Sequence, residues 1–122
     1  MTTLLLSHSD CLDHDTSPRH PESPDRLRAV MAALAAEEFR GLAREDAPFA
    51  SDAQILRAHP AEIFRYIAMA SEQAGDGYAR IDADTIVSRG SELAARRAAG
   101  AVCRAVEAVA RGEAGNAFCA VR

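Results

Sequence analysis

Lysine and tryptophan are both absent from the 122-residue sequence, so all 14 basic residues are arginines. Without lysine, the chain can perform no Schiff-base chemistry and cannot bind phosphate through a P-loop lysine. The arginines are outnumbered by 18 aspartates and glutamates, which gives a formal net charge of −4 at pH 7. Binding to a phosphate backbone needs an excess of positive charge, so this balance argues against direct nucleic-acid recognition.

Long apolar runs and paired cysteines are missing as well. The first apolar run, Leu4–Leu6, is far shorter than the roughly 18 residues of a membrane span, and no charged segment precedes it. The three cysteines, Cys11, Cys103 and Cys119, are widely spaced and odd in number, which does not suggest a disulfide framework. A cytoplasmic, membrane-free protein is therefore expected, with Cys103 and Cys119 as buried, inert thiols.

Large apolar side chains are scarce. Although 48% of the residues are hydrophobic, 27 of the 122 are alanine, and a methyl group buries little area. A chain of this length forms one domain at most. Its small side chains predict a poorly filled independent core, so we expect the chain to be part of something larger.

Two short apolar segments near the ends of the sequence predict buried β-strands. They are residues 2–7 and residues 116–121. Helical patterns lie between them, so we expect an α/β fold in which helices connect parallel strands. The second strand ends one residue before Arg122 without the elements that would cover a parallel sheet, which predicts a truncated sequence.

Capping and periodicity predict four helices between the strands. The first begins at Ser23-Pro24-Asp25, which combines a hydroxyl cap, a proline and an early acid, and it runs to Arg40 before Gly41. The apolar face of this first helix consists of Leu27, Val30, Met31 and Leu34. A short helix follows at 51–57 with a Ser51–Gln54 capping box, and the helix after His59-Pro60 has Ile63, Phe64 and Ile67 as its apolar positions. The fourth is an alanine-rich helix from Ser91 to about Arg111, with Leu93, Val102, Val106 and Val109 near one side.

Glycines mark two further features between the predicted strands. Gly75-Asp76-Gly77 predicts a turn, and residues 81–88 predict a loop with at most a short extended piece. Gly100 lies inside the alanine-rich helix, where glycine costs about 1 kcal/mol relative to alanine. This position therefore predicts the close approach of a neighbouring element.

Residues 8–23 are polar and have no periodicity, which predicts a long loop of the kind that usually has a function. Four potential zinc ligands follow the spacing H-x2-C-x2-H-x5-H, namely His8, Cys11, His14 and His20. One hypothesis is a self-contained zinc site in a small metal-binding protein. The spacing lacks the second ligand pair of the strong zinc motifs, which favours the alternative of polar residues that line a pocket edge or bind backbone groups.

Asp82 and Asp84 form a D-x-D-T segment in the loop before the last helix. Two carboxylates at this spacing can serve a metal, an acid–base pair or a substrate amide, whereas capping of loops and helices is their ordinary role. The sequence contains no G-x-S-x-G, C-x-x-C, H-E-x-x-H or glycine-rich phosphate loop. The residues alone therefore indicate an incomplete α/β domain with a polar first loop.

Four segments, taken in order, resemble the N-terminal part of the histone deacetylase superfamily, which includes acetylpolyamine amidohydrolases and acetoin-utilisation proteins. The segments are His20-Pro-Glu-Ser-Pro-Asp-Arg-Leu27; Gln54-Ile-Leu-Arg-Ala-His59; Asp82-Ala-Asp-Thr85 with Ser88, Gly90, Ser91 and Ala98-Ala-Gly100; and Asn116-Ala-Phe-Cys-Ala-Val-Arg122. The last resembles the strand that leads into the family's P-P-G-H-H. The resemblance covers essentially the whole chain.

The resemblance implies the three-layer arginase/deacetylase fold, of which residues 1–122 would be the N-terminal portion of a single domain. It also implies a zinc-dependent amidohydrolase that removes acetyl groups from acetyl-lysine or acetylpolyamine-type substrates. The family's zinc ligands and histidine pair match no position here and would follow Arg122. We therefore expect no metal ligand, no catalytic residue and no deacetylase activity in residues 1–122 alone.

Four residues acquire roles from the resemblance. Asp84 matches an aspartate that accepts hydrogen bonds from the substrate backbone, and Arg26 matches an arginine of the channel through which acetate leaves. His14 and His20 would border the pocket. On spacing alone, Arg26 is an exposed arginine in the first helical turn. A non-enzymatic remnant or a small helical interaction module is the alternative for the whole chain.

Overall fold

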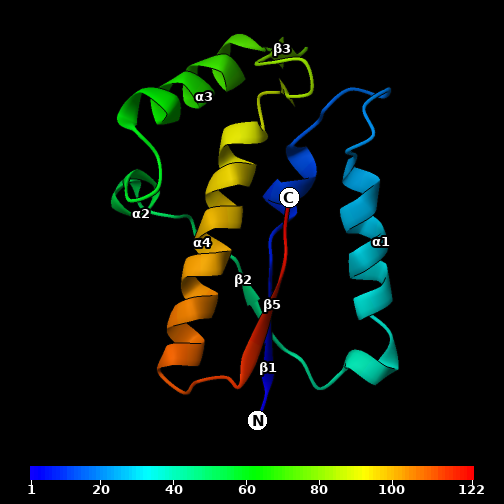
Figure 1. Ribbon diagram of the computed structural model, residues 1–122. Helices are drawn as coiled ribbons and strands as arrows, with labels where there is room; N and C mark the ends of the chain where they lie inside the picture. Colours follow the sequence, from blue (N-terminus) through cyan, green and yellow to red (C-terminus); the bar gives the residue numbers. More distant parts are fainter.

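The computed structural model describes residues 1–122 as a parallel sheet between helices, with an upper lobe beyond one end of the sheet (Figure 1). The strands of the main sheet are β1 (Thr3–Ser7), β2 (Ala43–Asp46) and β5 (Asn116–Ala120). The helices are α1 (Pro24–Leu34), α2 (Asp52–Leu56), α3 (Ala61–Gln73) and α4 (Ser91–Ala110), with short 3₁₀ helices η1 (Ser9–Asp13) and η2 (Glu37–Phe39) and a hairpin of β3 (Ala79–Arg80) and β4 (Ile86–Val87). None of the helices has the length and apolarity that crossing a membrane requires.

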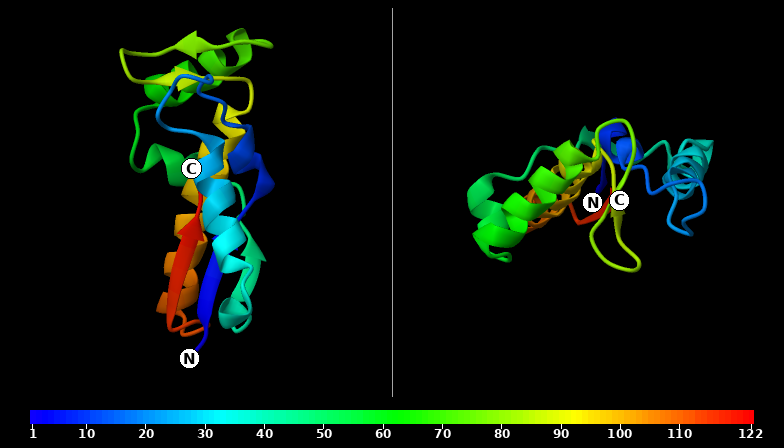
Figure 2. Two further views of the ribbon diagram at one scale, coloured as in Figure 1. Left: turned by 90° about the vertical axis from the view of Figure 1, so that its right-hand side faces the viewer. Right: turned by 90° about the horizontal axis from the view of Figure 1, so that it is seen from above.

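β1 is the central strand of the sheet, whose order is β2-β1-β5 with both pairs parallel. Leu4, Leu5 and Leu6 are at most 3% exposed, because α4 covers one face of the strand and α1 covers the other (Figure 2). Alternate side chains of a strand point to opposite faces. Leu4 and Leu6 therefore enter the core beneath α4, and Leu5 enters the core beneath α1, as the unbroken apolar run predicts.

α4 packs on the sheet through its smallest side chains. Ala101, Ala105 and Ala108 are buried against β1, and a Cβ built on Gly100 would lie 2.0 Å from the carbonyl oxygen of Pro48. The close approach predicted at Gly100 is therefore confirmed. The larger residues lie on the outer face of this helix, where Leu93, Val102, Val106 and Val109 are 40–63% exposed.

α1 has the predicted start and apolar face but a different end. The side chain of Ser23 caps it by accepting the N–H of Asp25, and Leu27, Val30, Met31 and Leu34 pack in the core beneath α1. The predicted end at Arg40 is wrong, because the helix stops at Leu34 and residues 37–39 form a separate 3₁₀ turn. The positions that would continue the apolar stripe are Glu37 and Glu38, so no packing sustains another helical turn.

β2 and the β3–β4 hairpin are the strands that the sequence does not predict as such. β2 has the sequence Ala-Arg-Glu-Asp and is exposed throughout, so it lacks the alternation that marks a half-buried strand. Its register, with Leu4 opposite Ala43, is continued by the hydrogen bond from Ala47 N to Ser7 O at 2.8 Å. In the hairpin, β4 is a short extended piece inside the predicted 81–88 loop, and β3 lies between that loop and the predicted turn at 75–77.

The short helix α2 confirms the predicted capping box. The N–H of Gln54 donates to Ser51 Oγ at 3.1 Å, and the N–H of Ser51 donates to Gln54 Oε1 at 2.8 Å. α3 follows Pro60 as expected, and Phe64 and Ile67 lie half-buried on it, whereas Ile63 is 50% exposed. These helices form the lobe beside the upper half of α4 (Figure 1).

Candidate functional site

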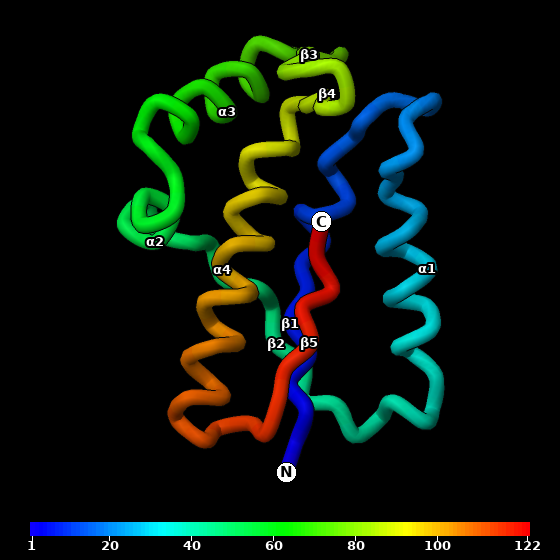
Figure 3. Tube along the Cα trace, in the orientation of Figure 1, coloured from blue at the N-terminus to red at the C-terminus, as the bar shows by residue number.

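The carboxyl ends of β1 and β5 meet at one edge of the sheet, since the two strands are parallel. The C-terminus lies there beside the start of the first loop, with the β3–β4 hairpin and the start of α4 beyond it (Figure 3). In open α/β sheets, ligands bind outside the carboxyl ends of the strands. This edge is therefore the candidate functional site.

A buried guanidinium holds the site together. The side chain of Arg122 is 1% exposed, and its Nε donates to Glu22 Oε1 at 3.0 Å while a second nitrogen donates to the other carboxylate oxygen. A third nitrogen donates to the carbonyl oxygens of Cys11, at 3.1 Å, and His14. The hydrogen bond from Arg122 lowers the pKa of Glu22, so this pair is charged at neutral pH.

Sequence reasoning assigned no role to Glu22 or Arg122 beyond their places in two motifs. A signal was present, because Arg122 directly follows a buried strand and a charge in such a place requires a partner. The partner could not be identified, since Glu22 lies 100 positions away in the chain.

His14 belongs to the first loop and contacts the first residue of α4. Its Nδ1 shares a hydrogen bond of 2.7 Å with Ser91 Oγ, and its Nε2 is 3.9 Å from Glu22 Oε2. Burial lowers the pKa of His14, and the neighbouring charge of Arg122 lowers it further. This histidine therefore joins two elements of the site and is largely enclosed by them.

His20 and Asp84 are brought together by the fold. The Nε2 of His20 donates to the carbonyl oxygen of Asp84 at 2.8 Å, and its Nδ1 accepts the N–H of Glu22 at 3.1 Å. The N–H of Asp84 donates to Asp82 Oδ1 at 2.9 Å, and this bond lowers the pKa of Asp82. Asp82 thus shapes the turn, while the exposed carboxylate of Asp84 makes no hydrogen bond or ion pair within the chain.

Arg26 lies at the carboxyl end of β5. One of its terminal nitrogens donates to Val121 O at 3.3 Å, and its Nε is 3.7 Å from Glu22 Oε1. The side chain remains 56% exposed. The four residues singled out from the sequence therefore gather around Glu22 and Arg122, with Arg26 on the α1 side and the others toward the hairpin and α4.

The first loop does not form the self-contained zinc site that its spacing allowed. No group of three or more His, Cys, Asp or Glu side chains could hold a metal ion. Cys11 is buried in the core beneath α1, while His8 binds the N–H of Asp10. The potential ligands therefore point in different directions, and the residues present do not fit zinc.

The other two cysteines are less buried than the sequence suggests. Cys103 and Cys119 are both partly exposed, because Cys103 lines a groove between α4 and the helices α2 and α3, and Cys119 lies in the edge strand β5. Partial burial still raises the pKa of the Cys119 thiol. This thiol therefore stays protonated at neutral pH, as expected for an inert residue.

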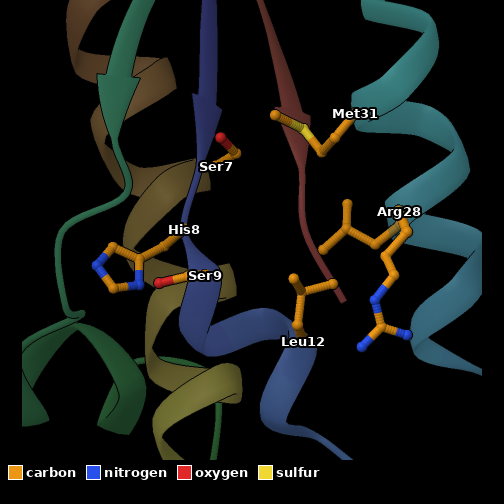
Figure 4. A pocket seen from close by; sticks show the side chains of 7 residues that line it. Ser7, His8, Ser9, Leu12, Arg28 and Met31 are labelled. Atoms are coloured by element: carbon orange, nitrogen blue, oxygen red, sulfur yellow. The ribbon is translucent and has the colours of Figure 1, made fainter.

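A cavity of about 380 Å³ lies between the end of β1, η1 and α1. Figure 4 shows Leu12 and Met31 on its apolar side, with Ser9 and the guanidinium of Arg28 at its margins. Neither Arg26 nor Asp84 lines it. The cavity is therefore separate from the cluster around Arg122.

Comparison with known proteins gives consistent results. A model of the histone deacetylase domain matches residues 20–122. A probable deacetylase from Archaeoglobus fulgidus is 35% identical over 125 residues, which cover 100% of this chain and 34% of that protein. A histone deacetylase-like amidohydrolase from Pseudomonas aeruginosa is 34% identical over 100 residues, which cover 81% of this chain and 26% of that protein.

The fold comparison agrees with these relatives. The crystal structure of the HD domain of HDA15 superimposes with a TM-score of 0.90 at 26% identity, covering 100% of this chain and 36% of that one. The α/β fold expected from the resemblance is thereby confirmed. The chain spans about a third or less of the length of the relatives that it matches.

Proposed function

Because this chain belongs to the histone deacetylase family, we propose that it is the N-terminal part of a zinc-dependent deacetylase. The whole protein hydrolyses the amide bond of an acetylated amine, of the acetyl-lysine or acetylpolyamine type. Relatives described as a deacetylase and an amidohydrolase support this reaction class. The chain matches only 34% of the first relative, and the proposal assigns the catalytic groups to the part beyond residue 122.

In this proposal, residues 1–122 supply one rim of the substrate pocket. The Asp84 carboxylate accepts hydrogen bonds from the backbone amides of the substrate, a role that suits an ionised, acceptor-only group. Its exposure and lack of an internal partner support this role, and this is the single observation that carries it. His14 and His20 border the pocket, and Arg26 lies on the path by which acetate leaves.

The zinc ion of the proposed enzyme has its ligands beyond Arg122, since the present side chains do not fit one. When bound, zinc polarises the acetyl carbonyl and the attacking water. Residues 1–122 contribute substrate contacts only. The isolated segment should therefore show no deacetylase activity.

The test has two stages. The coding sequence past residue 122 is read first, and the proposal expects Pro-Pro-Gly-His-His followed later by D-x-H. The whole protein is then assayed on an acetyl-lysine peptide and an acetylated polyamine, with zinc present and after chelation. Zinc-dependent release of acetate from either substrate supports the proposal. A stop codon after Arg122, or a whole protein inactive on both substrates, overturns it.

The alternative is a non-enzymatic chain that acts as an interaction module. Its support is the exposed apolar outer face of α4 and of β5, where Val106 is 63% and Phe118 is 50% exposed. Apolar surfaces of this kind mark either a binding site or an incomplete domain. An evolved module should be monodisperse and melt cooperatively, whereas part of a larger domain should aggregate.

A further inference from the structure

The loop that carries Asp84 has little support of its own. Its two strands contribute only two residues each, paired as Ala79 with Val87 and Arg80 with Ile86. One more backbone bond, from Ile81 N to Thr85 O at 2.9 Å, closes the loop. The other bonds within it are local, from Arg80 to the carbonyl oxygen of Ala83 at 2.8 Å and from the N–H of Asp84 to Asp82 Oδ1 at 2.9 Å. An isolated two-stranded hairpin is marginally stable at best, so this loop depends on contacts from elsewhere.

Three side chains join the hairpin region to the first loop. After β4, Ser88 Oγ accepts the N–H of Asp15 at 3.0 Å and donates to the carbonyl oxygen of Asp13 at 3.3 Å. The hydroxyl of Tyr78 donates to Asp15 Oδ2 at 3.0 Å, at the base of the hairpin. The Nε2 of His20 donates to the carbonyl oxygen of Asp84 at 2.8 Å. Of these contacts, only that of His20 acts on the residue that presents the free carboxylate.

The hydrogen bonds of His20 define its tautomer. Because Nδ1 accepts the N–H of Glu22 at 3.1 Å, this nitrogen carries no proton, and the hydrogen is on Nε2. Glu22 is in turn held by the buried guanidinium of Arg122. A continuous series of hydrogen bonds thus runs from the end of β5 through Glu22 and His20 to the backbone of Asp84.

We propose that His20 is a positioning residue that fixes the Asp84 backbone, so that the Asp84 carboxylate meets the substrate in one orientation. This inference rests on the proposed function of Asp84. It assigns to His20 a task distinct from bordering the pocket, because His20 acts through Asp84 and need not touch the substrate. Asp82, Ala83 and Thr85 are exposed, and the bond from His20 is the one hydrogen bond that joins residues 81–85 to the chain outside the hairpin, which supports the inference.

Two substitutions separate the two hydrogen bonds of the ring. In His20→Asn, the side-chain oxygen can replace Nδ1 as acceptor for Glu22, but the amide is too short to reach Asp84. In His20→Gln, the longer amide can replace Nε2 as donor to Asp84. We expect His20→Asn in the whole protein to lower kcat/KM about tenfold, mainly through KM, as loss of one hydrogen bond implies.

His20→Gln should recover most of that loss. In an Asp84→Ala background, His20→Asn should have no further effect, because His20 acts through Asp84. The inference is overturned if His20→Asn leaves KM unchanged, if both His20 variants lose activity equally, or if the losses from His20 and Asp84 add. Circular dichroism and Tm of each variant establish that the protein is folded.

A second readout does not depend on catalysis. Trypsin cleaves after arginine, and Arg80 lies at the start of the Asp84 loop, whereas Arg40 lies in an exposed turn far along the chain. His20→Asn should raise the rate of cleavage after Arg80 severalfold and leave that after Arg40 unchanged, while His20→Gln resembles the wild type. Equal rates of cleavage after Arg80 in all three proteins would contradict the proposal that His20 fixes the Asp84 loop. Should the wild type prove inactive, the proposed function fails, and this readout still tests the anchor.

Discussion

The guanidinium of Arg122 holds the carboxylate of Glu22 through two parallel hydrogen bonds, although the two residues lie 100 positions apart. Arg122 is buried, and its remaining donors satisfy the carbonyl oxygens of Cys11 and His14. The pair therefore joins the end of β5 to both halves of the first loop. A single side chain thus sets the arrangement of the candidate site.

Replacing Arg122 with alanine should lower the free energy of unfolding by about 2–4 kcal/mol, because it leaves a carboxylate and two carbonyl groups without their donor. Urea denaturation measures this change. Arg28→Ala removes an exposed ion pair with Asp25 and should change stability by less than about 1 kcal/mol. Equal losses in the two variants would contradict the central role of Arg122.

Stability should fall on acidification in two stages. Burial lowers the pKa of His14 below its ordinary value of 6.5, and the Arg122 hydrogen bond lowers the pKa of Glu22 below 4.5. At both residues the unfolded chain binds a proton more readily than the folded protein does. Their contribution to the free energy of unfolding is therefore fully present above pH 6.5 and decreases below it, first through protonation of His14 and then through protonation of Glu22.

A series of Tm measurements from pH 8 to pH 3 checks this dependence. His14→Asn should remove most of the decrease between pH 6.5 and pH 5 and leave the later decrease through Glu22. A wild-type Tm that stays constant from pH 7 to pH 5 would show that the folded and unfolded forms of His14 have the same proton affinity.

Gly100→Ala should destabilise the protein by about 1–3 kcal/mol, although alanine is the better helix former. The added Cβ would lie 2.0 Å from Pro48 O and 2.7 Å from Ala50 N, so α4 or the segment after β2 has to move. Gly41→Ala is the matched control, because a Cβ there meets nothing within 4 Å. Thermal unfolding of both variants distinguishes the clash from a general effect of losing glycine.

Asp84→Asn in the whole protein should lower kcat/KM by about tenfold or more, since a neutral amide is a weaker acceptor for substrate N–H groups than a carboxylate. The control is Asp76→Asn, which neutralises a fully exposed carboxylate nearby. Steady-state kinetics on the acetylated substrate give the comparison. Unchanged kinetics in Asp84→Asn would refute the assigned role.

Local signals in the sequence account for most of the fold. Three consecutive leucines predict the doubly covered strand β1, and Ser51 with Gln54 predicts the cap of α2. β2 could not be predicted from local signals, because its backbone pairing with β1, and not its own side chains, makes it a strand. The outer position of Val102 and Val106 is equally nonlocal, since it depends on the close contact made by Gly100.

The candidate site was predictable in its location but not in its contacts. The polar first loop and Asp84 stand out because their composition differs from that of the elements around them. The hypothesis of a zinc site in that loop was wrong because spacing gives no information on side-chain direction, and Cys11 faces the core. The link from His20 to Asp84 spans 64 positions, so it requires the tertiary structure.

The central position of β1 bears on how this chain acquires its structure during synthesis. β1 is synthesised before its partner β5, which becomes available only after residues 8–115 have been translated. Until then, one edge of the leucine-rich strand has no backbone partner, and such edges promote aggregation. Pairing of two strands that are so far apart in the sequence is also slow, because closing the loop between them costs entropy. A nascent chain of this protein therefore has to remain protected until β5 has been translated.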